Sequence, residues 1–363
     1  MKTRLFFLIA SIFLLSCQKQ SDTIITLRLD DAIHDGGQEI DIKKYIEQER
    51  LIPLETNDSL LLSYVSLIGV NDNNLFVESD QVVYVFSTEN GGLKSRIDRK
   101  GLGPEEYQSM IDVEIDNRSR TILLYDNIKR NFMTYDFEGN FISSVKNDII
   151  GGLSLLNDST YIVAYPPFSG QNNRIGMYDK NWNLGQQFLA IDESVYKDMD
   201  LFPFDDFGHY GEKSYFKPML EDTLYIIDSS PKPYIILSKG KYKIPTEVAI
   251  NVMKRNKDGY KYISGEYGYL LGDYYFLTYF YQNAMFQDIW NIKTQKLLFR
   301  NIVDENNNRN GIPYEINGYE LSIWPKFVSN DTMYCVIGAD DAINIIPSLP
   351  ADTNPVILEL KLK

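Results

Sequence analysis

The chain has 363 residues, of which 44% are hydrophobic and 13% aromatic, which is enough apolar material for a large core. Its formal charge of −14 at pH 7 comes from 36 Lys and Arg against 50 Asp and Glu, and such an acidic surface disfavours nucleic-acid binding. The mean hydropathy of −0.26 excludes a protein with many membrane spans, and the 26 tyrosines and 19 phenylalanines favour strands.

Residues 1–16 have the form of a secretory signal peptide. Lys2 and Arg4 precede an apolar run, 5–15, that is too short to span a bilayer comfortably. The segment Leu14-Leu15-Ser16-Cys17 resembles a bacterial lipobox, which implies that Cys17 becomes the lipid-modified first residue of the mature chain. An ordinary signal peptide followed by an incidental cysteine is the alternative.

The residues after Cys17 indicate the cellular location and the domain organisation of the chain. We expect residues 17–44 to form a lipidated tether and residues 45–363 to form one domain. Gln18 stands where an Asp would favour retention in the inner membrane, so the outer membrane is the expected location, with its periplasmic or surface face left open. Cys335 is the second of the two cysteines, so the mature chain cannot form an intramolecular disulfide, and its apolar surroundings predict a buried thiol.

Beyond residue 60 the sequence shows weak internal repetition. Short β-rich runs recur, joined by turns of Asn, Asp and Gly, and about four strands fit into each stretch of roughly 40 residues, the size of a propeller blade. The six units span 65–97, 112–145, 153–189, 200–237, 267–299 and 323–360. This pattern predicts an all-β chain folded as a six-bladed β-propeller.

The sixth unit lacks an outer strand, which the segment Arg50–Thr56 can supply. A ring closed in this way between N-terminal and C-terminal strands removes the unpaired sheet edge, and Pro53 fits only an edge position. The alternatives are an open sandwich or two β domains. The first strand of the fourth unit falls somewhere in 200–213, and a seventh blade remains open if 200–222 contains another unit.

Between the first two units the chain reads RKGLGPEEY, Arg99 to Tyr107. Gly101 and Gly103 permit backbone angles that other residues resist, Pro104 suits the first position of a short helical turn, and Tyr107 can pack between blades. A phosphate-binding loop is disfavoured because the spacing is not GxGxxG, and neither a long helix nor a Lys-Ser/Thr pair follows. We interpret the stretch as a connector.

RKGLGPEEY, together with Leu51–Thr56 and Asn354–Leu358, resembles the six-bladed β-propeller lipoproteins of Bacteroidetes, a family related in shape to NHL-repeat propellers. The resemblance covers roughly residues 40–363. It implies the fold and an exported lipoprotein, and it brings no established catalytic residues. The fourth unit and the stretch 304–320 match this pattern least well.

Few catalytic groups are available. The chain has two histidines, His34 and His209, which leaves almost no material for a His-ligated zinc site or a Ser-His-Asp triad. Acids are plentiful, so a calcium site or a carboxylate pair for glycosidic cleavage stays open. Aspartates nevertheless recur at equivalent turns of the units, which indicates turn chemistry.

A ligand is expected on the face that carries the crossings between blades and the loops between middle strands, because loops vary while the scaffold stays rigid. The candidate ligand-binding residues combine aromatic and hydrogen-bonding groups suited to a glycan or a peptide, although an aromatic residue there can equally pack between blades. They are Tyr107, Arg130, Phe168, Arg174, Tyr281 and Asn283.

Two functions follow from these observations. The first is a non-enzymatic binding or scaffold lipoprotein of the cell envelope, held to the membrane through Cys17, with a glycan, peptide or protein as ligand. The second is a hydrolase or lyase with an acidic central channel, for which no cofactor is expected and calcium is left open. The shortage of catalytic groups favours the first.

Overall fold

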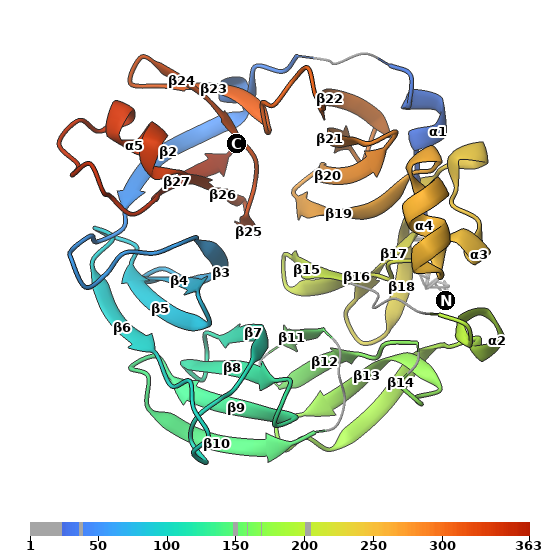
Figure 1. The fold of residues 1–363 in the computed structure, drawn as a ribbon, viewed down its shortest axis with the longest axis horizontal. Helices are drawn as coiled ribbons and strands as arrows, with labels where there is room; N and C mark the ends of the chain where they lie inside the picture. Colours follow the sequence, from blue (N-terminus) through green and yellow to red (C-terminus); the bar gives the residue numbers. More distant parts are fainter. Residues whose placement is uncertain (1–23, 36–38, 148–151, 158, 168, 200–204) are drawn as a thin grey trace, which may run out of the picture.

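The computed structural model describes residues 24–35, 39–147, 152–157, 159–167, 169–199 and 205–363. Six sheets stand around a central axis like the blades of a propeller, with the first strand of each unit innermost (Figure 1). This is the predicted six-bladed β-propeller, and no seventh blade is present among the described residues. Strands joined by short turns pair antiparallel because the chain reverses direction at every turn.

The first three blades each have four strands in sequence order. Blade one consists of β3 (Ser66–Val70), β4 (Asn74–Ser79), β5 (Val82–Ser87) and β6 (Leu93–Ile97). Blade two consists of β7 (Met110–Asp116), β8 (Thr121–Asp126), β9 (Asn131–Asp136) and β10 (Phe141–Lys146). Blade three consists of β11 (Leu153–Asn157), β12 (Thr160–Ala164), β13 (Asn173–Asp179) and β14 (Leu184–Ala190).

The last three blades include two strands from the beginning of the chain. Blade four consists of β15 (Asp206–Tyr210), β16 (Lys213–Lys217), β17 (Thr223–Ile227), β18 (Pro231–Ser238) and β1 (Ile25–Arg28). Blade five consists of β19 (Ser264–Leu271), β20 (Tyr274–Tyr281), β21 (Ala284–Asn291) and β22 (Lys296–Val303). Blade six consists of β25 (Phe327–Ser329), β26 (Thr332–Ile337), β27 (Val356–Leu362) and β2 (Ile46–Pro53).

Strand β2 is the outer strand of blade six. It pairs antiparallel with β27 from Ile46 opposite Leu362 to Pro53 opposite Val356. Ile52 is 1% exposed and lies opposite the buried Ile357. A strand from the start of the domain therefore completes the sheet made by its end, as the sequence of 50–56 led us to expect.

The segment that we predicted as a tether contains regular structure. Strand β1 adds to blade four in parallel to β18, and α1 (Leu29–Ala32) follows it. Leu27 and Leu29 are fully buried. The propeller domain of the structure therefore begins before residue 45, because an apolar strand here can cover the outer edge of blade four.

Elements outside the blades gather at two places. The helices η2 (Gly240–Tyr242), α3 (Thr246–Ala249), α4 (Val252–Asp258) and η3 (Gly259–Lys261) connect blade four to blade five and stand in front of blade four in Figure 1. The hairpin of β23 (Ile312–Ile316) and β24 (Tyr319–Ile323) and the helix α5 (Ala339–Ile345) accompany blade six. The short elements α2 (Glu193–Tyr196) and η1 (Ile42–Tyr45) complete the described set.

The core is divided among the interfaces between blades. In the described part of the chain each of the six interfaces holds one hydrophobic cluster, made by one face of each neighbouring sheet. Aromatic rings fill much of this space; Phe132 of blade two stacks on Trp182 of blade three with ring centroids 3.9 Å apart. Each blade is therefore stabilised by both neighbours, and a ring needs its last interface as much as its first.

Buried charges reinforce two places around blades four and five. Glu266 lies between two lysine ammonium groups, with Lys239 Nζ at 2.7 Å and Lys217 Nζ at 3.0 Å. Within blade five, Arg300 makes a two-pronged ion pair with Asp288 and also donates to the backbone oxygen of Ala32. All five charged side chains are almost or wholly excluded from solvent.

The stretch RKGLGPEEY connects blade one to blade two, as predicted. Tyr107 is fully buried between the two blades, and its hydroxyl donates to the backbone oxygens of Gln81 and Ile97. Neither Gly101 nor Gly103 has a left-handed backbone angle. Their missing side chains instead leave room for the carboxylate of Glu106, which accepts the N–H of Gly103 at 2.7 Å.

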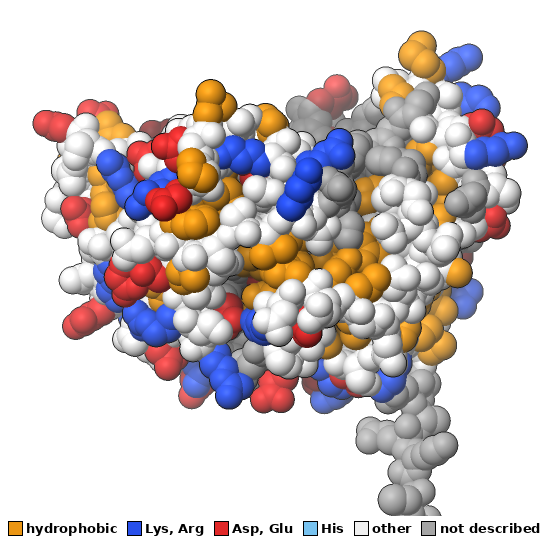
Figure 2. Space-filling model, turned by 90° about the horizontal axis from the view of Figure 1, so that it is seen from below, with side chains coloured by type: hydrophobic (Ala, Val, Ile, Leu, Met, Phe, Trp, Pro, Cys, Tyr) orange, Lys and Arg blue, Asp and Glu red, His pale blue; other side chains and the backbone are white. Residues whose placement is uncertain are grey.

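The rim of the ring carries a mixture of charges. Figure 2 looks at the side of blades two and three, where acidic and basic side chains are interspersed around a central group of hydrophobic side chains. On the outer strand β10, Ile142 is 52% exposed. In the described part of the chain, no helix is long and apolar enough to cross a membrane.

Candidate functional site: the central channel

The inner strands of all six blades line one cavity on the ring axis. Its volume is about 880 Å³, and β3, β7, β11, β15, β19 and β25 each contribute residues to its wall. We call it the central channel. Asn127 and Pro166 line it on the face that carries the crossings between blades, and Asn117 and Asn330 line it at the turns of the opposite face.

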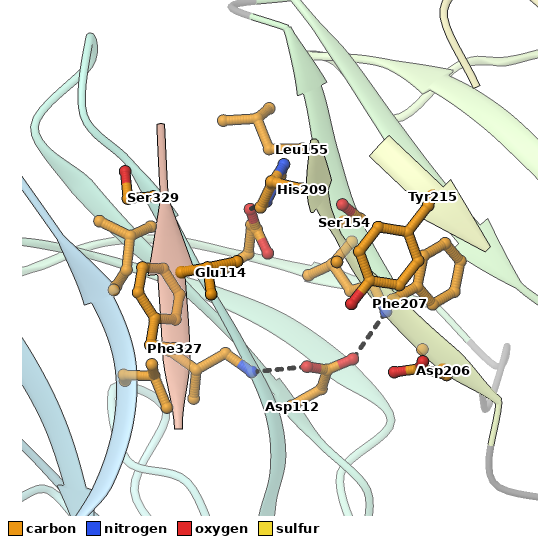
Figure 3. Close-up of a pocket in the computed structure, with 18 of the residues that line it drawn as sticks. Asp112, Glu114, Ser154, Leu155, Asp206, Phe207, His209, Tyr215, Phe327 and Ser329 are labelled. Atoms are coloured by element: carbon orange, nitrogen blue, oxygen red, sulfur yellow. Dashed lines mark hydrogen bonds and ion pairs between the residues drawn. The ribbon is translucent and has the colours of Figure 1, made fainter. Parts of the chain in front are cut away.

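Two aromatic rings face the channel from different blades. Phe207 of β15 and Phe327 of β25 lie on opposite sides of the pocket, with Asp112 and Glu114 of β7 between them (Figure 3). Both phenylalanines are only partly buried, so part of each ring is available to a ligand. The channel thus combines apolar surface with carboxylates, which is the usual composition of a small-molecule site.

Asp112 is held by the backbone of two strands. Its carboxylate accepts the N–H of Leu153 at 2.6 Å and the N–H of Val113 at 2.9 Å (Figure 3). Burial raises the pKa of Asp112 to about 7, although the two backbone N–H groups oppose this rise. The group therefore changes its charge near neutral pH.

Asp206 is a second carboxylate of this kind. It begins β15 and accepts the N–H of Gly268 at 3.0 Å, across the interface between blades four and five. Burial raises the pKa of Asp206 to about 7, against the lowering effects of this hydrogen bond and of Lys217. Tyr215 lies beside it in the wall and donates its hydroxyl hydrogen to the backbone oxygen of Gly268.

Glu114 and His209 meet across the channel. Glu114 Oε1 of blade two lies 3.2 Å from His209 Nε2 of blade four (Figure 3). The contact therefore joins the two blades on either side of blade three. Burial alone would lower the pKa of His209, but the hydrogen bond to Glu114 and the charge of that carboxylate raise it above its usual value. The pair ties two blades that are not neighbours.

Two further charged groups stand at the edge of the channel. Asp205 lines it and forms a buried ion pair with Arg174, whose Nη2 lies 2.7 Å from Asp205 Oδ2. Lys326 also lines it and is exposed to solvent. Among the described residues, no three His, Cys, Asp or Glu side chains are grouped so that they could hold a metal ion.

The structure does not bring the predicted ligand-binding residues together. Tyr107 is buried between blades, Arg174 is 2% exposed and paired with Asp205, and Tyr281 is 6% exposed and packs edge-on against Tyr242. Arg130 and Asn283 are exposed at turns between middle strands. None of these five is part of the channel wall, and Phe168, like Cys17, lies outside the described residues.

The channel residues were missed because the ligand was expected on loops. Asp112, Glu114 and Asp206 sit inside or at the start of strands, where alternating polar residues usually face solvent. One signal was available: a polar residue in the first strand of a propeller unit faces the axis or a neighbouring blade, and it needs a partner there. His209 could have been placed the same way once Asp206–Tyr210 was recognised as an inner strand.

The fold and the channel together define the class of this protein as a six-bladed β-propeller with an axial cavity. A family model described as "Domain of unknown function (DUF4934)" matches residues 24–362, and the chain belongs to that family. The matched range includes β1, which agrees with the start of the propeller in the structure. No curated protein matches the chain.

Two crystal structures share the fold. One is BF0058, a candidate exported protein from Bacteroides fragilis NCTC 9343, with a TM-score of 0.67 and 16% identity over 94% of this chain and 100% of that one. The other is a member of the duf4221 family from Bacteroides vulgatus ATCC 8482, with a TM-score of 0.55 and 11% identity over 88% of this chain and 97% of that one. At these identities the likeness shows the fold alone.

Proposed function

We propose that this chain is a cell-envelope lipoprotein whose propeller binds a ligand in the central channel and catalyses no reaction. The channel itself carries the proposal. Its volume of about 880 Å³ lies within the range of ligand pockets, and its wall is assembled from rigid strands of six blades, so it is preformed.

The composition of the wall supports a glycan, a peptide or a segment of a partner protein as the ligand. Phe207 and Phe327 offer ring faces to a ligand. Asp112 and Glu114 of β7 and Asn127 of the turn after β8 offer hydrogen-bonding groups at different positions along the channel. Ring faces bind the apolar side of a sugar or an aliphatic side chain, and the polar groups fix its orientation.

The envelope location depends on a lipid anchor that we propose at Cys17. The proposal rests on the signal-like segment 1–16 and on the lipobox that ends at Cys17. The structural relative BF0058 carries a name that suggests export, which agrees with this address. We place the anchor in the outer membrane, because Gln18 lacks the acidic residue associated with inner-membrane retention.

Two experiments test the parts separately. Replacing Cys17 with Ser should release the protein from the membrane fraction, and a variant that remains membrane-bound contradicts the anchor. For the channel, titration of neutral oligosaccharides and short peptides by calorimetry should find binding that Leu155→Trp abolishes, because the larger ring fills the cavity. Leu184→Trp, on the outer strand β14 and 47% exposed, is the control. Equal loss in both variants, or binding that survives Leu155→Trp, contradicts a channel site.

The second candidate is a hydrolase or lyase with an acidic channel. The specific observation in its favour is that Asp112 and Asp206, both with a pKa raised to about 7, line one cavity, as acid–base catalysts do. Metal analysis of the purified protein tests the calcium-dependent form. Turnover of a bound oligosaccharide that Asp112→Asn and Asp206→Asn both abolish would favour the enzyme over the binding protein.

A further inference from the structure

We infer that the central channel selects an organic cation: an ammonium or guanidinium group on an apolar stem, such as a lysine or arginine side chain of a peptide. The inference rests on the proposed function, because it concerns the chemistry of the ligand in the same cavity. Its basis is that two carboxylates without an ion pair, Asp112 and Asp206, line a cavity that two aromatic rings also face, with Asp112 between those rings (Figure 3).

The charges that face the channel do not balance locally. Two of its carboxylates have a cationic partner: Asp205 is paired with Arg174, and Glu114 is bonded to His209, which neutralises it when the imidazole is protonated. Asp112 and Asp206 make no ion pair within the described part of the chain. Among the residues that the structure describes, the titratable groups in the channel wall are Asp112, Glu114, Asp205, Asp206, His209, Tyr215, Tyr269 and Lys326.

The nearby cations are poorly placed to compensate the two aspartates. Lys217 acts on Asp206 but is fully buried and bonded to Glu266 at 3.0 Å. Lys326 is exposed at the channel wall, where water weakens its effect. A ligand cation that enters the cavity would therefore add a positive charge to a wall in which neither aspartate has an ion-pair partner among the described residues.

The aromatic rings suit the same group. Phe207 and Phe327 face the cavity from opposite sides and leave Asp112 between them (Figure 3). A cation over a ring face is attracted by the ring quadrupole, and more strongly where water is excluded. Leu155 and Val113 in the same wall provide apolar contact for a methylene stem.

The titration of the aspartates gives the inference its own signature. Burial raises the pKa of Asp112 and of Asp206 to about 7, so each is partly protonated at neutral pH. A bound cation favours the ionised carboxylate and lowers that pKa. Binding must then release protons, and the affinity must fall as the pH is lowered from 8 to 6. A neutral or anionic ligand does not have this linkage.

The test uses three capped tripeptides and the full-length protein in detergent solution. The probes are acetyl-Ala-Lys-Ala-amide, the same peptide with an acetylated lysine, and acetyl-Ala-Glu-Ala-amide. Calorimetry at pH 7 in two buffers of different ionisation enthalpy measures affinity and proton release together. We expect the lysine peptide to bind about tenfold more tightly than the acetylated one, since acetylation keeps the stem and removes the charge.

Two channel variants and one control connect the result to the site. Asp206→Asn keeps an oxygen that can accept the N–H of Gly268, and Phe327→Leu keeps apolar volume; each should weaken the lysine peptide about fivefold or more. Asp206→Asn should also reduce the proton release. Glu138→Gln makes the same charge change at an exposed turn that pairs with Arg120, and it should leave binding unchanged. Near-ultraviolet circular dichroism checks that each variant is folded.

Each other outcome contradicts the inference. Equal affinity for the lysine and acetylated peptides, tighter binding of the glutamate peptide, absence of proton release, or no binding of the lysine peptide up to 10 mM (roughly the weakest affinity worth calling specific) all overturn it. The proposed function can survive when this inference fails. If a neutral oligosaccharide binds and Leu155→Trp abolishes that binding, the channel is a ligand site for a different chemistry; if no channel ligand is found, both fail.

Discussion

The closure between β2 and β27 can be tested with one buried side chain. Ile52 is 1% exposed, lies opposite Ile357 and belongs to the hydrophobic cluster between blades six and one. Replacing a buried isoleucine by alanine typically costs about 2–5 kcal/mol, because it removes apolar contacts and leaves a cavity. The fully buried position leads us to expect about 3 kcal/mol for Ile52→Ala.

The expected shift in melting temperature follows from the size of the domain. With roughly 340 residues in one cooperative unit, the entropy of unfolding is about 0.7 kcal/mol/K, so a loss of about 3 kcal/mol lowers Tm by about 4 °C. Ile142→Ala, on the outer strand of blade two and 52% exposed, should change stability by no more than about 0.5 kcal/mol. Urea unfolding and calorimetry of both variants give the comparison.

A double-mutant cycle separates closure from general destabilisation. Because Ile52 and Ile357 are cross-strand partners, Ile52→Ala and Ile357→Ala should be non-additive by about 0.5 kcal/mol or more. The distant pair Ile52→Ala and Ile142→Ala should be additive. If Ile52→Ala costs no more than Ile142→Ala, the β2–β27 contact does not hold the ring together in solution, and the reasoning from closure is refuted.

Three further predictions concern buried positions. Gly91→Ala should cost more than about 2 kcal/mol, because Gly91 has a φ of +72° and an added Cβ would lie 1.8 Å from a backbone oxygen of β2. The control, Gly211→Ala, should cost only about 1 kcal/mol, because Gly211 has a φ of +60° and nothing within 4 Å of the added Cβ. Equal urea midpoints for the two variants would contradict this prediction. Arg300→Met should cost about 3–5 kcal/mol because it leaves Asp288 buried and unpaired, and adding Asp288→Leu should recover most of it in the same assay. Burial alone would raise the pKa of Glu266, but two lysines lower it to about 2, so its contribution to stability is present above about pH 4.5 and is lost as the pH falls from 4.5 to 2. Glu266→Gln should therefore make the free energy of unfolding, measured with urea, less dependent on pH between 4.5 and 2. An unchanged pH dependence in this range would contradict the pairing.

Much of the fold follows from the sequence because propeller units are local. Each blade is a run of hairpins, and its turns are marked by Asn, Asp and Gly a few residues apart, so strand order can be read along the chain. The outer strand of blade six could also be expected, since the last unit was one strand short and 50–56 was strand-like. The parallel pairing of β1 with β18 could not, because nothing in four residues, Ile25–Arg28, specifies a partner some 200 positions away.

The site was harder to predict than the fold for a physical reason. Strand alternation places Asp112 in a strand but does not say whether its side chain faces the axis, a neighbouring blade or solvent. That choice depends on where blades three and four stand, since the hydrogen bond of Asp112 goes to Leu153 and the partner of Glu114 is His209. The sequence could therefore indicate polar residues in inner strands, whereas only the assembled ring shows which of them meet.

The channel and the closure are physically one system. Phe327 lies on β25, a strand of three residues that is held in place by β26, which in turn pairs with the closure strand β27. Loosening of blade six would move one wall of the channel and admit water, which weakens every electrostatic interaction inside it. A ligand that contacts blades two, four and six at once would oppose that loosening; at 100 times its Kd it adds about 2.7 kcal/mol to the folded state. That is close to the free-energy cost expected for Ile52→Ala. Ligand binding in the channel and strand pairing at the rim are therefore expected to stabilise the folded ring by similar amounts.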